Sequence, residues 1–143
     1  MKYYIDTSAL VSVIAQEADA FRMRDWLDSN AGGSLIIGDW VETEFSAALS
    51  IKMRNRQIDQ ESRAAALGEF ARLARESFEI LPVLRSHFRA ATRFANVPAL
   101  GVRAGDALHL AIAADIGATI ITYDRRMAEA APVLGISARL LLD

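Results

Sequence analysis

One stretch of the sequence, residues 103–124, combines a helix, a helix stop and a buried strand. Its apolar residues recur at helical spacing as far as Ile116, and Gly117 is the residue type that most often follows a helix end. Residues 118–122 then form a short apolar run, and Asp124 comes just past it. A helix that leads directly into a buried strand constrains the chain to an α/β fold.

Asp106 lies on the apolar side of this predicted helix. On a helical wheel it lines up with Leu110 and Ala113, at i+4 and i+7, on the stripe that should face the core. Free backbone N–H groups in the first turn favour a carboxylate by only about 0.3 to 1 kcal/mol. A charge on that stripe therefore needs a partner, which is either Arg103, one turn earlier, or a bound cation.

The rest of the chain repeats this alternation of short apolar runs and amphipathic helices. The first run, 2–5, ends in the polar turn Asp6-Thr7-Ser8, and a helix follows from Ala9. Further strands are predicted at 34–37, 79–83, 118–122 and 137–142, and further helices at 18–29, 39–54, 59–78, 84–96, 103–116 and 125–134.

This order of elements predicts an α/β protein with a mostly parallel sheet of about four to five strands and helices on both faces. Ligands of such sheets bind beyond the carboxyl ends of the strands, where the strand order reverses. Asp6 follows the first strand and Asp124 follows the fourth, so we expect these strands to be central neighbours. Together with Asp106 and an acid from the helix at 39–54, they are expected to converge on one rim.

The helix at 39–54 offers two candidates for the fourth acid. Glu44 lies on one edge of its apolar stripe and Glu42 flanks the other edge, so periodicity does not choose between them. Simple structural roles are also open for the acids at the strand ends. Asp6 and Asp124 each precede a helix and suit its N-cap, a role that does not exclude metal ligation.

Composition limits the class of protein. A chain of 143 residues with 52% hydrophobic content can bury one core, and we expect a single domain, 1–143. Cysteine is absent, which suits a reducing cytoplasm. Asp115, expected to be solvated, interrupts the longest apolar run, so we expect a soluble protein without a membrane span. The formal net charge of −2 restricts any nucleic-acid contact to a local surface.

Four carboxylates on one rim repel one another unless a cation lies among them. Oxygen ligands favour a hard ion, Mg²⁺ or Mn²⁺, over zinc, and His109 is interpreted as a structural histidine rather than a ligand. Such an ion polarises a phosphodiester and lowers the pKa of an attacking water, which is nuclease chemistry. Lys52, Arg54 and Arg56 are interpreted as a hydrated helix end, with contact to RNA phosphate as the alternative.

Four motifs stand in order along nearly the whole chain: YYIDTSAL, VETEFSAAL, RAGDALHLAIA and ITYDRRMAEAA. Together they resemble PIN-domain ribonucleases, and in size and motif order the chain looks like the VapC-type toxins of bacterial toxin–antitoxin pairs. The resemblance implies a PIN-like fold. Any one of these motifs alone would be a weak signal, whereas the set of four is specific.

By this resemblance, the catalytic and metal-binding acids of the family fall on Asp6, Glu44, Asp106 and Asp124. The family's Glu before a run of small residues and Leu selects Glu44 over Glu42. The family's supporting polar positions match Thr7, Ser8 and Thr122. The implied activity is Mg²⁺- or Mn²⁺-dependent endonucleolytic cleavage of RNA by metal-activated water. The implied partners are a second copy of the chain, giving a homodimer, and a small cognate antitoxin that inhibits the enzyme.

Three other functions are weighed against this one. A phosphatase of the haloacid-dehalogenase type requires a second acid two residues after the first, where this chain has Ser8. A receiver domain requires an adjacent acidic pair near the first strand and a late lysine, and both are missing. A non-catalytic PIN-like protein-interaction module is the stronger alternative, but such a module has no need of a complete acid set.

Overall fold

The computed structural model describes residues 1–142. Its strands are β1 (Lys2–Ile5), β2 (Ser34–Gly38), β3 (Glu79–Leu81), β4 (Thr119–Thr122) and β5 (Ala138–Leu140). Its helices are α1 (Thr7–Ile14), α2 (Ala20–Ser29), α3 (Asp39–Arg54), α4 (Gln60–Glu76), α5 (Arg85–Ala95), α6 (Ala104–Ile116) and α7 (Arg125–Val133), with a 3₁₀ turn, η1 (Pro98–Leu100), between α5 and α6. No helix among these residues is long and apolar enough to cross a membrane.

The five strands form one parallel sheet in the order β3-β2-β1-β4-β5. This confirms the predicted α/β class, and β1 and β4 are central neighbours as expected. Tyr4 of β1 lies opposite Ile36 of β2 on one side and Ile120 of β4 on the other. The chain places β2 and β3 on one side of β1, and then β4 and β5 on the other side. The strand order therefore reverses between β1 and β4.

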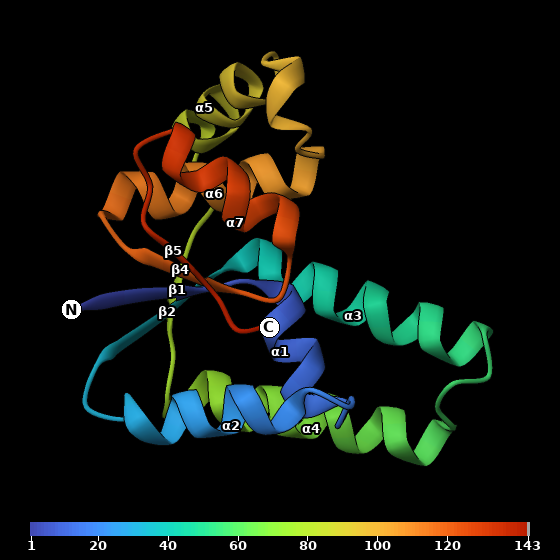
Figure 1. Ribbon diagram of the computed structural model, residues 1–143. Helices are drawn as coiled ribbons and strands as arrows, with labels where there is room; N and C mark the ends of the chain where they lie inside the picture. The colour runs from blue at the N-terminus through green and yellow to red at the C-terminus, as the bar shows by residue number, and fades with distance from the viewer. Residues whose placement is uncertain (143) are drawn as a thin grey trace.

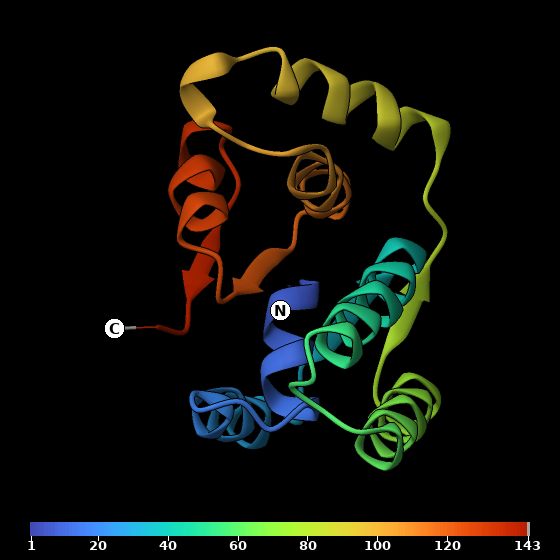
Figure 2. The ribbon, with the colours of Figure 1, turned by 90° about the vertical axis from the view of Figure 1, so that its right-hand side faces the viewer.

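Helices cover both faces of the sheet. Figure 1 shows α1, α2 and α4 below the strands, α5 to α7 above them, and α3 running out to the right at about the level of the sheet; Figure 2 shows the arrangement from the side. The strands are therefore apolar on both faces: Ile5, Ile37 and Ile121 are all at most 1% exposed. The core fixes the positions of the strand ends, and the polar residues that follow β1 and β4 are held on this rigid frame.

The differences from the predicted elements are small and have local causes. Thr7 and Ser8 belong to the first turn of α1, not to a turn before it, because Asp6 caps the helix directly by accepting a hydrogen bond from the Ala9 N–H. The predicted strands at 79–83 and 137–142 shorten to three residues each, and Pro82, which has no N–H to donate, follows β3 directly. The predicted helix stop at Gly117 is confirmed.

Two glycines give a stability test with opposite signs. Gly117 has a φ of +64°, where an Ala side chain is strained, so Gly117→Ala should lower the free energy of unfolding by about 1 kcal/mol. Gly68 lies within α4 with open space where a Cβ would stand, so Gly68→Ala should raise it by roughly 0.5–1 kcal/mol. Urea unfolding measures both, and equal effects of one sign would contradict the helix-end geometry.

Candidate active site

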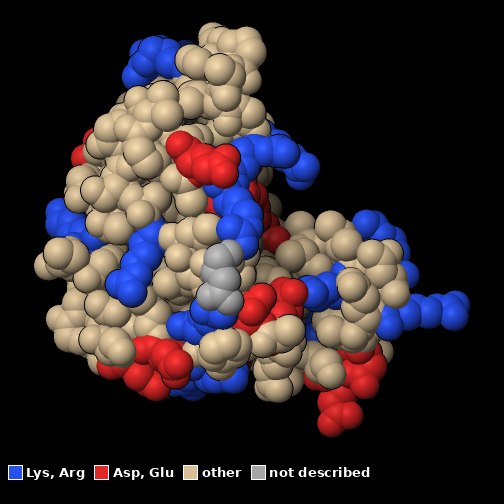
Figure 3. Space-filling view, viewed as in Figure 1, with Lys and Arg blue, Asp and Glu red and all other residues tan. Residues whose placement is uncertain are grey.

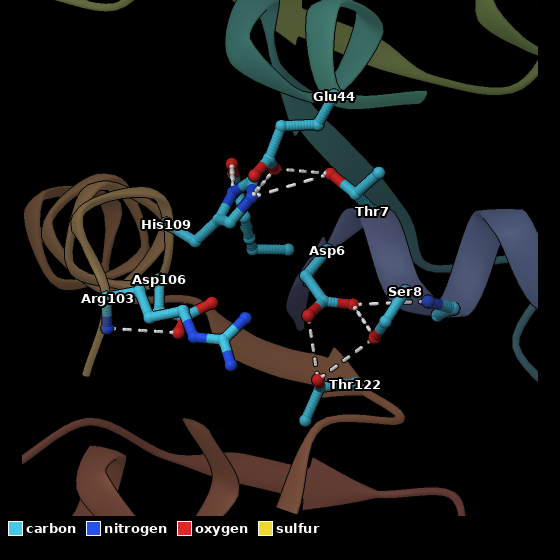
Figure 4. Close-up of polar contacts among 10 residues, drawn as sticks. Asp6, Thr7, Ser8, Glu44, Arg103, Asp106, His109 and Thr122 are labelled. Carbon is cyan, nitrogen blue, oxygen red and sulfur yellow. Dashed lines mark hydrogen bonds and ion pairs between the residues drawn. The ribbon is translucent and has the colours of Figure 1, made fainter. Parts of the chain in front are cut away.

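Asp6 lies between the ends of β1 and β4, and its side chain is 2% exposed. One carboxylate oxygen accepts hydrogen bonds from Ser8 Oγ at 2.7 Å and from the Ala9 N–H at 3.2 Å. The other accepts from Thr122 Oγ1 at 2.7 Å (Figure 4). The N-cap role predicted from the sequence is confirmed, and the carboxylate also joins the first helix to the fourth strand.

The two hydroxyls donate to Asp6. Ser8 Oγ itself accepts from the Tyr123 N–H at 3.0 Å, and Thr122 Oγ1 accepts from the Asp124 N–H at 2.9 Å. Each hydroxyl oxygen thus already receives a proton, and its own proton points at the carboxylate. Asp6 is arranged as a pure acceptor, which is the ionised form of the side chain.

Burial opposes that ionised form. It raises the pKa of Asp6 above its ordinary value, although His109 and the hydrogen bonds from Ser8, Thr122 and the Ala9 N–H act in the other direction. The ion pairs formed among residues 1–142 do not include this carboxylate. The hydrogen-bond donors favour the charged form of Asp6, but no lysine or arginine of the described chain neutralises that charge. A bound cation would neutralise it.

Asp106 lies in the first turn of α6 and is half-buried. It accepts a hydrogen bond from the backbone N–H of Arg103 at 3.2 Å, so the contact between these two residues runs through the main chain and not through an ion pair. Burial raises the pKa of Asp106, and the negative charges of Asp124 and Glu44 raise it further. Arg103 is therefore not an ion-pair partner of Asp106, and the cation stays a prediction.

Asp124 caps α7 with one oxygen, which accepts from the N–H groups of Arg126 and Met127 at 2.9 and 3.2 Å. Asp106 and Asp124 face one recess of about 480 Å³. The residues lining this recess are Arg103, Asp106, Asp124, Arg125, Arg126 and Glu129. Figure 3 shows acidic atoms inside a hollow between the upper helices and α3, with basic side chains at its margin. The recess therefore combines carboxylates inside with guanidinium groups around them.

Glu44 faces the same rim from α3, whereas Glu42 is exposed. One Glu44 oxygen accepts from Thr7 Oγ1 at 2.7 Å and forms a very short contact with His109 Nε2 (Figure 4). Burial acts to raise the pKa of Glu44, but the hydrogen bonds and charge of His109, with the bond from Thr7, outweigh it and hold the pKa below its ordinary value. Between the two glutamates that periodicity left open, the fold turns only Glu44 inward.

His109 has a larger part in this site than its sequence interpretation suggested. It is 2% exposed and links the Tyr4 hydroxyl, 2.7 Å from its Nδ1, to Glu44 at its Nε2. Its place three residues after Asp106 on one helix was the available signal. The expectation that Asp115 is solvated is confirmed, since its side chain is 56% exposed, and it also bonds to the buried His87 at 2.8 Å, because α5 packs against α6 there.

The donor set fits a hard divalent ion by its chemistry. Asp6, Glu44, Asp106 and Asp124 come from four separate segments and offer carboxylate oxygens at one edge of the sheet. In residues 1–142 no three His, Cys, Asp or Glu side chains stand close enough together, as they are oriented here, to hold a metal ion. Each acid is instead bound by hydrogen-bond donors of the protein.

The family model described as PIN domain matches residues 3–132. The chain belongs to the PIN domain family. It is 37% identical over 139 residues to Ribonuclease VapC35 of Mycobacterium tuberculosis, covering 94% of this chain and 93% of that protein. This similarity extends the resemblance seen in the motifs to the length of the domain.

Solved structures show the same fold at low sequence identity. VapBC2 from Rickettsia felis, bound to a DNA fragment from its promoter, matches with a TM-score of 0.73 and 18% identity, covering 98% of each chain. Mycobacterium tuberculosis VapC20, a toxin that cleaves the sarcin–ricin loop, matches with a TM-score of 0.71 and 18% identity, covering 90% of this chain and 94% of that one.

The buried charge of Asp6 should make the active site a source of instability. Because the folded-state pKa of Asp6 is raised, its contribution to stability falls as pH rises through that pKa, and Asp6→Asn removes this loss. In EDTA near pH 8, Asp6→Asn should melt above the wild type, and the difference should shrink as the pH falls towards the ordinary carboxyl pKa of about 4. Scanning calorimetry with the exposed Glu42→Gln as control measures this. A variant that melts below the wild type at both pH values would contradict it.

Proposed function

We propose that this protein is a metal-dependent endoribonuclease and the toxin of a toxin–antitoxin pair. The observation that carries the proposal is the buried Asp6 carboxylate, which is surrounded by fixed donors, has no cationic partner in the described chain, and lies at the strand-order reversal. The 37% identity to a protein named a ribonuclease supports the choice of substrate. We also propose that residues 1–143 form a single PIN domain.

The resident ion in this proposal is Mg²⁺ or Mn²⁺, held by Asp6, Glu44, Asp106 and Asp124. When bound, such an ion lowers the pKa of a coordinated water and neutralises charge on a phosphodiester. Ser8 and Thr122 orient Asp6, and Thr7 orients Glu44. These hydroxyls keep the carboxylate oxygens in fixed directions, so the side chains lose little further conformational freedom when the ion binds.

The RNA backbone would enter the recess that Asp106 and Asp124 share. Arg103, Arg125 and Arg126 line it, and guanidinium groups suit phosphate oxygens by charge and by geometry. This local arrangement offsets a formal net charge of −2, which would otherwise repel RNA. Lys52 is a weaker candidate for phosphate contact, because it pairs with Glu17 at 3.7 Å.

The proposed partners are a small antitoxin and a second copy of the chain. Structures with the same fold include VapBC complexes, which supports an antitoxin partner. A groove of about 660 Å³ between α1, α2 and α4, with apolar lining that includes Ile14, Leu27 and Leu73, offers a surface for an apolar segment. It meets α1 at the C-terminal end of that helix, at Val13 and Ile14, whereas Thr7 and Ser8 are in its first turn.

Neutralising either of the two acids that line the recess should abolish cleavage. We expect Asp106→Asn and Asp124→Asn each to reduce metal-dependent cleavage of a fluorescent RNA by roughly a hundredfold or more, because a ligand is lost. Circular dichroism should show both variants folded. Glu42→Gln, a change of an exposed acid on the same helix as Glu44, should cleave at the wild-type rate.

A folded Asp106→Asn or Asp124→Asn protein that cleaves normally would remove that residue from the site. If no variant and no wild-type preparation cleaves any RNA, the alternative of a non-catalytic interaction module is favoured.

Divalent ions should stabilise the protein. At a concentration of Mn²⁺ about a hundredfold above its Kd, linkage adds about 2.7 kcal/mol, which corresponds to roughly 5 °C or more in Tm for a chain of this size. EDTA should abolish both this shift and RNA cleavage, whereas Ca²⁺ should bind yet support little turnover. An unchanged Tm in millimolar Mn²⁺, with cleavage resistant to EDTA, would contradict the metal.

A further inference from the structure

We propose that Tyr4 and His109 are positioning residues, which hold the Glu44 carboxylate at the rim of the acidic site and thereby strengthen the binding of a divalent cation there. The inference rests on the proposed function, since it concerns the same site. It goes beyond the four acids and their neighbouring hydroxyls by giving a part to two buried groups on other elements, one on β1 and one on α6.

The direction of the hydrogen bonds follows from the atoms around His109. Nε2 faces the carboxylate of Glu44, which can only accept, so the imidazole proton lies on Nε2. Thr7 Oγ1 lies 3.4 Å from the same nitrogen and donates to the same Glu44 oxygen. Nδ1 lies 2.7 Å from the Tyr4 hydroxyl oxygen, so the ring bridges Tyr4 and Glu44.

Tyr4 is suited to be the donor that fixes this ring. Its side chain is completely buried, and burial raises the pKa of its hydroxyl, with the negative charge of Asp6 acting in the same direction. Its oxygen also receives a hydrogen bond from the Gly38 backbone. With the oxygen occupied in this way, the hydroxyl proton points at His109 Nδ1. The result is a chain of donors that runs from the sheet through Tyr4 and His109 to Glu44.

The fold leaves Glu44 little room on its other side. A Cβ added at Gly105 would lie 2.7 Å from the second Glu44 oxygen, which is closer than real Cβ contacts. The first turn of α6 therefore approaches the carboxylate closely because residue 105 has no side chain. Glu44 is held between His109 and Thr7 on one oxygen and the backbone of α6 at the other.

This arrangement ties two parts of the acid set together. Glu44 comes from α3, which runs out at about the level of the sheet in Figure 1, and Asp106 comes from α6, which lies above the sheet. His109 is three residues from Asp106 on α6, so its bond to Glu44 fixes one acid relative to the helix that carries another. A long, flexible glutamate that is already oriented loses less conformational freedom when an ion binds.

The chain provides a matched control for each residue. His87 is also buried and also bound to a carboxylate of α6, but its partner is Asp115, nine residues after Asp106 and so about 13 Å farther along the helix. Tyr3 is the neighbour of Tyr4 on β1, and its ring packs edge-on against Trp26. Neither control touches Glu44 in the described structure.

The decisive measurement is Mn²⁺ affinity by isothermal titration calorimetry on the intact protein. Tyr4→Phe should weaken Mn²⁺ binding about fivefold, the effect of one lost hydrogen bond, and His109→Asn about tenfold. In RNA cleavage, the Mn²⁺ concentration for half-maximal rate should rise by the same factors, while the rate at saturating Mn²⁺ changes less. Tyr3→Phe and His87→Gln should leave Mn²⁺ affinity unchanged, although His87→Gln lowers Tm.

A double-mutant cycle separates positioning from general structural support. In the background of Glu44→Gln, Tyr4→Phe and His109→Asn should cause no further loss of Mn²⁺ affinity, because they act through Glu44. Gly105→Ala provides an independent perturbation: it improves helix propensity yet pushes on the Glu44 carboxylate, so it should fold and still weaken Mn²⁺ binding. If His109→Asn does not fold, Tyr4→Phe and Gly105→Ala carry the test.

Three results would overturn the proposal while the ribonuclease function stands: wild-type Mn²⁺ affinity in folded Tyr4→Phe, equal losses with and without Glu44, or equal losses in the Tyr3 and His87 controls. Failure of the proposed function is distinguishable, because the wild type itself would then bind no Mn²⁺ and cleave no RNA.

Discussion

The site depends on one constraint: a carboxylate is kept in the interior by hydrogen-bond donors that the fold holds in place. Ser8 and Thr122 each accept a backbone N–H from the segment after β4, and each donates to Asp6. This geometry joins β1, α1 and β4, and it leaves a charge that burial disfavours and no described ion pair offsets. The fold carries this cost at the strand-order reversal, which is where parallel sheets bind their ligands.

Much of the fold could be predicted because its signals are local. Apolar runs, helical periodicity and Gly117 gave the parallel sheet, both helical layers and most element ends within a few residues. Asp6 and Asp124 were expected at one rim because each follows a strand, and the neighbouring strands β1 and β4 bring them there. The start of α1 was misplaced, since an Asp that reads as a turn residue also caps a helix without any turn.

The contacts that orient the acids could not be predicted from the sequence. Helical spacing could not separate Glu44 from Glu42, because which of them faces the site depends on how α3 is rotated against α6. The contact that shows this rotation joins Glu44 to His109, 65 residues later in the chain. The part of Tyr4 is still less visible, since its partner lies 105 residues further along the chain and a tyrosine in an apolar strand is ordinarily read as core. Resemblance proposed the acids, but not the buried groups that contact them.

The placement of β1 at the centre of the sheet has a consequence for synthesis of the chain. Asp6 emerges from the ribosome early, yet its donor Thr122 follows it by 116 residues, and β1 lacks its second neighbour until β4 is made. A domain assembled from such distant segments folds late, after nearly all of its length is available. A truncated or stalled translation product therefore lacks the catalytic centre. The topology thus keeps an unfinished copy of the enzyme inactive, without help from any inhibitor.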